Sequence, residues 1–249
     1  MIEIKNLKKS FNQNEVLRGI DLTINDNEIV SIIGSSGGGK STLLRCLNFL
    51  EHADSGRINI GDVKVDCSKA DKKDIKQLRA KSTMVFQNFN LFKNKTAIEN
   101  IMEPLIVNQK ISKTEARKIA LEYLERVGLK EKQNEFPSRL SGGQQQRIGI
   151  ARALALNPEV ILFDEPTSAL DPELVTDILK LIKEVSTEKR TMIIVTHEMA
   201  FARDVSDKVV YMDKGEIVEQ GNPEQIFTNP KEERTKQFLA RYLQPEYII

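Results

Sequence analysis

Gly34-Ser35-Ser36-Gly37-Gly38-Gly39-Lys40-Ser41-Thr42 is the most informative stretch of this sequence. It fits the pattern G-x-x-x-x-G-K-[ST], which has a physical meaning only between a strand and a helix. The apolar run 28–33 precedes it, and Leu43, Leu44 and Leu47 follow it at helical spacing. The sequence therefore predicts a strand, a tight loop and a helix, in that order.

The composition of this loop suits the binding of a phosphate group. Gly37 to Gly39 carry no Cβ atom, so the backbone can wrap a phosphate closely and point several N–H groups at it. A helix that opens at Lys40 adds the positive end of its dipole. We expect Lys40 to reach the β- and γ-phosphates of ATP and the hydroxyl of Ser41 to ligate Mg²⁺. Ser35, Ser36 and Thr42 are expected to help hold the phosphates.

Carboxylates follow a second apolar run. Residues 160–163 are typical of a parallel strand buried on both faces, and Asp164 and Glu165 come directly after them. A carboxylate at the C-terminal end of a parallel strand, beside a phosphate loop, is placed to hold Mg²⁺, and we assign that role to Asp164. Glu165 points the other way along the strand and can approach an attacking water. The next buried strand, 192–196, ends at His197.

A second glycine-rich helix start lies at Leu140-Ser141-Gly142-Gly143-Gln144. Ser141 is a good N-cap, and the two glycines expose backbone N–H groups. One ATP needs only one phosphate loop, so a second helix start of this kind calls for a second subunit. We expect two chains to pack head to tail, with residues 141–144 of each closing over the γ-phosphate held by the other.

Helical periodicity replaces strand signals between about 88 and 157. Apolar residues recur three or four positions apart there, as in Ala116, Ile119, Ala120, Tyr123, Leu124 and Val127. We interpret this stretch as a helical subdomain inserted into an α/β core formed by residues 1–87 and 158–249. The whole chain, 1–249, is then one domain.

The two glycine-rich strings together resemble one family, the ATP-binding subunits of ABC transporters, and the resemblance runs from about residue 1 to residue 243. It implies an α/β fold with a P-loop NTPase (RecA-like) core, an antiparallel β portion and the helical insert. It also implies that ATP is bound between two copies of the chain and hydrolysed with Mg²⁺.

The resemblance assigns roles to several further residues. Glu165 matches the general base, and His197, within Val195-Thr196-His197-Glu198, matches a switch histidine that contacts the γ-phosphate. Gln87 matches a glutamine that senses both Mg²⁺ and the attacking water. Phe11 lies where the family places an aromatic that stacks on adenine, although a buried core phenylalanine is a competing interpretation. Asp171 ends the stretch Ser168-Ala169-Leu170-Asp171, which resembles the loop that crosses the dimer interface.

The finer resemblance is to the ATPase subunits of importers for polar amino acids. It rests on residues 86–92, on Leu140 to Arg147, and on Phe227 to Thr235. The stretch 95–103 tilts toward cystine importers. Membership implies integral membrane permease subunits as partners and, through them, an extracytoplasmic amino-acid-binding protein. Coupling to the permease is expected through Gln87 and the segment 88–100, with Phe89, Leu91 and Phe92 either at the surface or in the core.

Composition excludes several function classes. The chain has 249 residues, 37 Lys plus Arg and 36 Asp plus Glu, so a net charge of +1 gives no case for nucleic acid. No run approaches the length of a membrane span, and Met1 leads into Glu3 and Lys5 rather than into a signal peptide. We expect a peripheral protein at the cytoplasmic face of the membrane, with Cys46 and Cys67 as free thiols.

Two competing functions stay open at this point. One is an ABC ATPase of the DNA-repair or translation type, although such proteins usually carry coiled coils, zinc-hook cysteines or tandem ATPase domains. The other is a nucleotide-dependent binding module without turnover, which the presence of Glu165, His197 and Gln87 disfavours.

Overall fold

The structure is a computed structural model and describes residues 1–243. These residues form two sheets and nine α-helices. The strands are β1 (Ile2–Phe11), β2 (Asn14–Ile24), β3 (Ile29–Ile33), β4 (Ser55–Ile60), β5 (Val63–Asp66), β6 (Ser82–Val85), β7 (Val160–Asp164), β8 (Thr191–Val195), β9 (Lys208–Asp213) and β10 (Glu216–Gly221). The α-helices are α1 (Lys40–Leu47), α2 (Lys72–Lys81), α3 (Ala97–Gln109), α4 (Lys113–Arg126), α5 (Gly142–Ala155), α6 (Pro172–Ser186), α7 (Met199–Val205), α8 (Pro223–Thr228) and α9 (Glu233–Leu243).

The larger sheet is almost entirely parallel. Its strand order is β10-β9-β3-β8-β7-β6, and only the edge strand β10 runs antiparallel to its neighbour. Every residue of β3, β7 and β8 is buried, as expected for strands that are covered on both faces. Together with the separate antiparallel sheet β2-β1-β4-β5, this arrangement confirms the predicted fold class.

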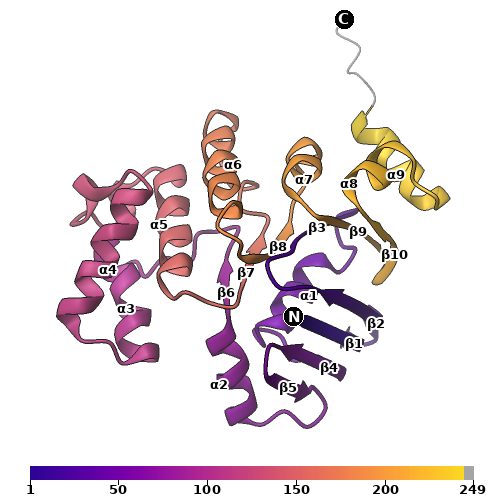
Figure 1. The fold of residues 1–249 in the computed structure, drawn as a ribbon, viewed down its shortest axis with the longest axis horizontal. Coiled ribbons are helices and arrows are strands. Elements are labelled where there is room, and N and C mark those ends of the chain that lie inside the picture. Colours follow the sequence, from indigo (N-terminus) through magenta and orange to yellow (C-terminus); the bar gives the residue numbers. More distant parts are fainter. Residues whose placement is uncertain (244–249) are drawn as a thin grey trace, which may run out of the picture.

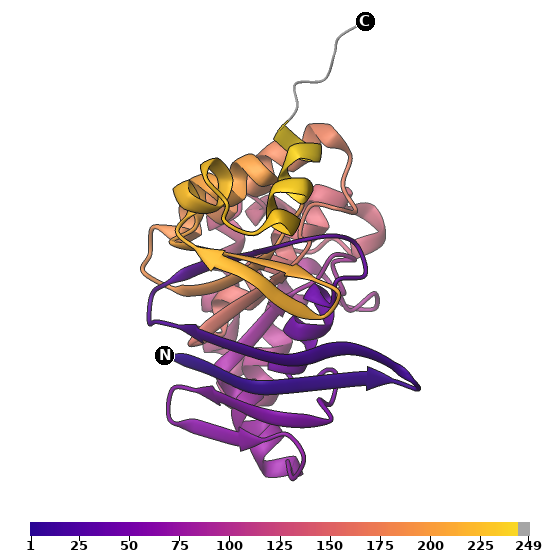
Figure 2. The same cartoon turned by 90° about the vertical axis from the view of Figure 1, so that its right-hand side faces the viewer.

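Successive side chains of the central strands point to opposite faces of the sheet and pack into two different cores. Val160 and Leu162 pack with α1 and with the antiparallel sheet, whereas Ile161 and Phe163 pack with α3 to α6. Figure 1 shows α1 between the two sheets, with α3, α4 and α5 gathered at one end of the molecule. Figure 2 shows the antiparallel sheet from its side, with α8 and α9 above β9 and β10.

The register of the parallel strands brings the predicted site to the C-terminal ends of β3, β7 and β8. Asp164 pairs with Val195, and Ile32 pairs with the same residue from the other side. The segments that leave β3, β7 and β8 therefore begin at the same level. They carry the glycine-rich loop, the two carboxylates and His197.

The first strand is longer than its apolar residues indicate. Apolar and polar residues alternate only over residues 2–4, but β1 extends to Phe11. The reason is a register shift between Ile4 and Leu7, where Asn6 adopts a left-handed backbone conformation with φ of 47°. This irregularity turns Leu7 inward and breaks the alternation of apolar and polar residues on which a sequence-based prediction depends.

Burial distinguishes further side chains. The buried face of α6 consists of Ile178, Leu181, Ile182 and Val185, whereas Leu174, Val175 and Leu179 are only partly buried. His52 is exposed. Cys46 and Cys67 are buried free thiols, as predicted, and burial raises the pKa of Cys46 to about 12 and that of Cys67 to about 11.

We expect Leu162→Ala to lower the free energy of unfolding by about 2–5 kcal/mol, because it opens a cavity between β7 and α1. Val107→Ala is the control, since Val107 is 51% exposed and its truncation should change stability by less than about 0.5 kcal/mol. Urea unfolding at 25 °C measures both variants. A loss for Leu162→Ala no larger than that of the control would contradict the two-core arrangement.

Candidate functional site

The loop between β3 and α1 is shaped by close approaches of the backbone. A Cβ atom on Gly34 would lie 1.9 Å from the carbonyl oxygen of Met212, so no other residue fits there. Gly39 has a φ of 96°, and its Cβ would lie 2.8 Å from the carbonyl oxygen of Val16. The loop is thus wedged between β2 and β9, with Ser36 and Gly37 exposed at its tip and Thr42 half-buried in the first turn of α1.

The N-terminus of α1 lacks the cap that most other helices of this protein have. Gly39 supplies no side chain, and no acidic residue lies in the first turn. By contrast, α2, α3, α4, α5 and α8 are capped by the side chains of Asp71, Thr96, Ser112, Ser141 and Asn222. The first N–H groups of α1 are therefore left for a ligand, and the loop fits a phosphate group.

Lys40 lies over the loop with its ammonium group directed at the backbone. Its Nζ donates to the carbonyl oxygens of Gly34 and Ser35, both at 2.8 Å, and the residue is buried. Burial lowers the pKa of Lys40, while the carboxylates of Glu165 and Asp164 oppose that shift. The cation is therefore held where negative charge, whether of these carboxylates or of a phosphate, is favourable.

Ser41 and Asp164 meet although 123 positions separate them in the chain. The Ser41 hydroxyl donates to Oδ1 of Asp164 at 2.5 Å, and Arg45 approaches the other carboxylate oxygen at 3.5 Å. A hydroxyl and a carboxylate are hard oxygen ligands of the kind that Mg²⁺ takes, with water and phosphate oxygens completing its shell. Among residues 1–243 no cluster of three His, Cys, Asp or Glu side chains could hold a metal.

Glu165 occupies a strained position beside His197. Its φ is 46°, in the left-handed region that residues other than glycine rarely adopt, and such strain gathers at functional sites. One carboxylate oxygen lies 3.0 Å from Nε2 of His197, and the other accepts from the Ser168 hydroxyl at 3.0 Å. The hydrogen bond to His197 is the main cause that lowers the pKa of Glu165, so the carboxylate is ionised at neutral pH.

Phe11 is not a core residue. It lies at the tip of the β1–β2 hairpin, is 41% exposed, and has the Lys9 ammonium 4.7 Å from its ring centroid. Because Val16 of the same hairpin contacts Gly39, the ring lies on the hairpin that flanks the glycine-rich loop. The competing interpretation of Phe11 as a buried residue is therefore wrong.

Three further predicted features can be placed in the structure. Gln87 lies two residues beyond the end of β6, the neighbour of β7, so it leaves the sheet at the same ends of the strands as Asp164. The hydroxyl of Ser35 donates to Asp213 at 3.0 Å, so in this structure it serves the loop's attachment to β9. Phe92 is 43% exposed, whereas Phe89 and Leu91 are half-buried, so the interpretation of all three as core residues is wrong.

The helix α5 packs into a different hydrophobic core from the one that contains α1. Ser141 accepts from the backbone N–H of Gln144 at 3.3 Å, and Oε1 of Gln144 accepts from the Ser141 N–H at 3.0 Å, which completes a capping box. Cβ atoms on Gly142 and Gly143 would touch Leu170, which directly precedes Asp171, and Leu174, which follows it by three residues. Ser141 to Gln144 and Asp171 therefore lie close together, and the structure does not place them with the loop around Lys40.

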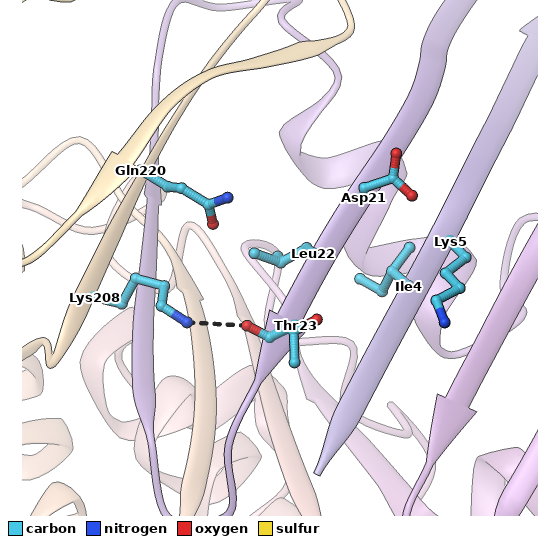
Figure 3. Close-up of a pocket in the computed structure, with 7 residues that line it drawn as sticks. All are labelled: Ile4, Lys5, Asp21, Leu22, Thr23, Lys208 and Gln220. Carbon is cyan, nitrogen blue, oxygen red and sulfur yellow. Dashed lines mark hydrogen bonds between the residues drawn. The ribbon is translucent and has the colours of Figure 1, made fainter. Parts of the chain in front are cut away.

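The hollow drawn in Figure 3 lies elsewhere. It is lined by residues of β1, β2, β9 and β10, and Lys208 closes one side by donating to the Thr23 carbonyl oxygen at 2.9 Å. None of the predicted site residues lines it. The candidate site is therefore at the C-terminal ends of the central strands rather than in this hollow.

Sequence reasoning did not find Gln146, which is fully buried in α5. Its Nε2 donates to the carbonyl oxygens of Pro166, at 2.8 Å, and Phe86, at 3.3 Å. A signal was present, because Gln146 lies at helical spacing between Gly143 and Ile150 on the buried face of α5. A glutamine in an otherwise apolar helix face marks a buried polar contact.

Comparisons with known proteins agree with this geometry. A family model described as ABC transporter matches residues 17–168. The chain is 56% identical over its full length to the full length of a probable amino-acid import ATP-binding protein, YxeO, of Bacillus subtilis. It is 55% identical to the L-cystine import ATP-binding protein TcyC of the same organism, over 98% of this chain and 100% of the relative.

A solved structure supports the same relationship in three dimensions. It is the dimeric post-hydrolysis state of the ATP-binding cassette MJ0796 bound to ADP and Pi, with a TM-score of 0.80 and 37% identity. The match covers 90% of this chain and 99% of that one.

We expect Lys40→Ala to weaken binding of Mg-ATP by about 10- to 100-fold, since the variant loses a charge-assisted contact to phosphate. Isothermal titration measures the affinity, and Lys64→Ala, an exposed lysine of β5, controls for the change in net charge. Thermal melting without nucleotide separates lost contact from a collapsed loop. Equal affinity of the two variants would refute the phosphate assignment.

Proposed function

We propose, since the chain belongs to the ABC transporter family, that it is the ATP-hydrolysing subunit of an importer for a polar amino acid. The observation that carries this proposal is that three groups meet at the C-terminal ends of the parallel strands. They are Lys40, the Ser41–Asp164 pair and the Glu165–His197 pair. Each group suits one part of phosphoryl transfer to water.

ATP binding is assigned to the loop, to α1 and to the N-terminal hairpin. The backbone of residues 35–39 and the uncapped start of α1 supply N–H donors for the phosphates. Lys40 supplies a positive charge, and Thr42 lies in the same first turn. The exposed ring of Phe11 offers a face on which adenine can stack.

Mg²⁺ would be held by the Ser41 hydroxyl and the Asp164 carboxylate, with Gln87 as a third oxygen donor. When bound, it neutralises charge on the β- and γ-phosphates. The Ser41 hydroxyl donates a hydrogen bond to Asp164, so the two oxygens already lie side by side.

Hydrolysis is assigned to the pair Glu165 and His197. Glu165 accepts a proton from the attacking water, which requires the ionised carboxylate that the lowered pKa maintains, although the same shift makes it a weaker base. His197 is held 3.0 Å from Glu165 and orients that carboxylate. In a nucleotide-bound chain the same imidazole would contact the γ-phosphate. Ser168 fixes the other carboxylate oxygen.

A second copy of the chain completes each site. Ser141, Gly142, Gly143 and Gln144 rest on the core that does not hold the phosphate loop, so they are free to meet another copy's nucleotide. The similar cassette MJ0796 is dimeric with ADP and Pi, which supports the same pairing here. Asp171, beside the start of α5, would lie in that interface.

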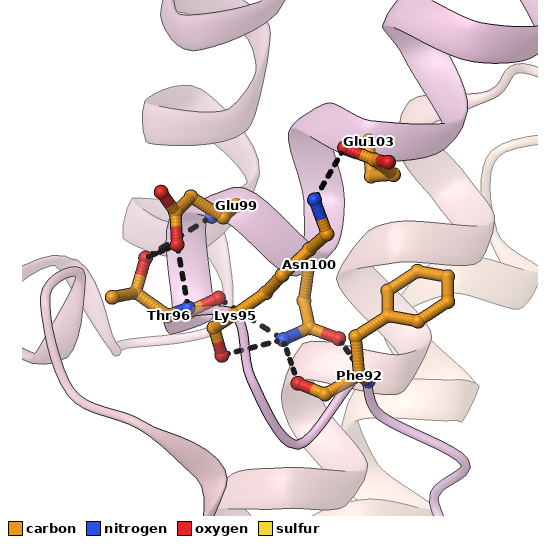
Figure 4. Close-up of polar contacts among 6 residues, drawn as sticks. All are labelled: Phe92, Lys95, Thr96, Glu99, Asn100 and Glu103. Atoms are coloured by element: carbon orange, nitrogen blue, oxygen red, sulfur yellow. Dashed lines mark hydrogen bonds and ion pairs between the residues drawn. The ribbon is translucent and has the colours of Figure 1, made fainter.

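The segment after Gln87 is the proposed contact with a membrane permease. Asn100 is fully buried, and its amide bonds the backbone of Phe92, Lys95 and Thr96 at 2.7–3.2 Å, as Figure 4 shows. Lys95 pairs with Glu103 at 2.8 Å. The loop is thus rigid while the Phe92 ring stays 43% exposed, which suits an apolar contact with another protein.

Peripheral attachment at the cytoplasmic face of the membrane follows from this partner. None of the helices within residues 1–243 is both long and apolar enough to cross a membrane. A permease would hold the chain there and would receive its solute from an extracytoplasmic amino-acid-binding protein. Similarity to relatives named for cystine import favours cystine as the solute.

We expect Glu165→Gln to form an ATP-dependent dimer. Glutamine keeps the shape of the side chain but cannot accept the proton, which should slow hydrolysis by about 10²- to 10⁴-fold and leave ATP in both sites. Light scattering with ATP, with ADP and without nucleotide tests this, and only ATP should support the dimer. The control is Ser141→Arg in the same background, which should bind ATP as a monomer and stay monomeric. A monomeric Glu165→Gln protein in ATP would refute the shared site.

We expect cells that lack this chain to lose uptake of a polar amino acid. Uptake of labelled cystine, glutamine and arginine is compared between the deletion strain, the strain complemented with wild type, and the strain complemented with Glu165→Gln. Wild type should restore uptake of one solute, with cystine expected, and Glu165→Gln should not. Unchanged uptake of all three would contradict the assignment to this class of importer.

A further inference from the structure

Gln146 is a buried polar side chain that the proposed mechanism does not use. It is 0% exposed, although a methionine or leucine would fill the same space on the apolar face of α5. Its Oε1 has no hydrogen-bond partner among residues 1–243. Leaving a buried acceptor unpaired is unfavourable, so packing alone gives no reason for a glutamine here.

The amide directs both of its hydrogens at carbonyl oxygens. Nε2 lies 2.8 Å from the oxygen of Pro166 and 3.3 Å from the oxygen of Phe86. Both partners are acceptors, so only Nε2 can face them, and the orientation of the amide is fixed. The unpaired Oε1 is the consequence of that orientation.

The two carbonyls belong to residues adjacent to the reacting groups. Pro166 directly follows Glu165, whose φ of 46° marks a strained turn, and Phe86 directly precedes Gln87. Glu165 follows β7 and Gln87 follows β6, so the amide of Gln146 ties together the ends of two neighbouring strands. A shift of α5 therefore acts on both residues at once.

Ser141, the N-cap of the same helix, lies five residues before Gln146. We propose that Gln146 is a positioning residue that sets Glu165 and Gln87 according to where α5 lies. This inference rests on the proposed function, in which the start of α5 contacts the nucleotide of the partner. Hydrolysis in a chain's own site then depends on contact of its α5 with the other site.

A second side chain of α5 holds only one of these loops. Arg152 donates to the carbonyl oxygens of Asn90, at 2.9 Å, and Phe89, at 3.2 Å. It fixes the segment after Gln87 and makes no hydrogen bond to the turn at Glu165 within the described chain. Gln146 alone bonds both of the segments that carry the reacting groups, as far as residues 1–243 show.

The test compares Gln146→Met with Gln145→Met in the full chain. Gln145 is the matched control, because its amide bonds only the Leu140 carbonyl oxygen at the start of the same helix. Affinity for ATP should stay within about two-fold of wild type in both variants. The single-turnover rate of ATP hydrolysis should fall about 10²-fold in Gln146→Met, as expected for misplaced reacting groups, and stay near wild type in Gln145→Met.

A double-variant comparison separates positioning from damage to the fold. In a Glu165→Gln background the carboxylate is already gone, so Gln146→Met should lower the residual rate far less than 10²-fold. Equal fold-losses in the two backgrounds, or a wild-type rate in Gln146→Met, would overturn the inference. If Gln146→Met does not fold, judged by urea unfolding, Gln146→Asn takes its place, since it keeps the amide but is too short to reach both carbonyls.

The outcome also distinguishes the inference from the function on which it rests. A wild-type chain that binds ATP without hydrolysing it would overturn the proposed function, and the inference with it. A wild-type chain that hydrolyses ATP, with Gln146→Met equally active, would overturn the inference alone.

Discussion

Parallel strands that are buried on both faces can bear polar groups only where they end. In this protein β3, β7 and β8 have no exposed residue, so the chemistry of the molecule is confined to the segments that leave them. The register brings those ends to one level, which is why a lysine, a serine, two carboxylates and a histidine meet there although they come from three distant parts of the chain. Two cores on opposite faces of the sheet hold this edge in place.

Most of the site could be predicted because its residues lie in local patterns. The glycine-rich loop, Asp164 after an apolar run and Ser141 before a helix are each recognisable from a few consecutive letters. The register shift at Asn6 and the exact buried face of α6 could not be found this way, because they are set by contacts with other elements. Gln146 is of the same kind, since its partners lie 20 and 60 positions away. What remained hidden was the pairing of side chains across elements.

Polar side chains contribute hydrogen bonds that hold the segment between β6 and α3, in addition to its apolar packing. Asn100, Gln146 and Arg152 hold backbone carbonyls between residues 86 and 96, and Gln146 also reaches Pro166. Arg152 does so at the expense of its own solvation, since burial lowers the pKa of its guanidinium to about 10. Directional bonds keep a segment in one conformation while still allowing a second discrete arrangement, which a close-packed apolar contact resists.

The uncapped start of α1 makes the nucleotide part of the secondary structure. The helix has only eight residues and no side chain on its first N–H groups, so without a ligand its first turn is the weakest part of a short element. A bound phosphate would act as the missing N-cap. Amide hydrogens of this turn would then exchange with solvent more slowly in the bound state, and the whole domain would gain stability with nucleotide concentration by mass action. Substrate supply and the folding equilibrium of the protein are thereby linked through one helix end.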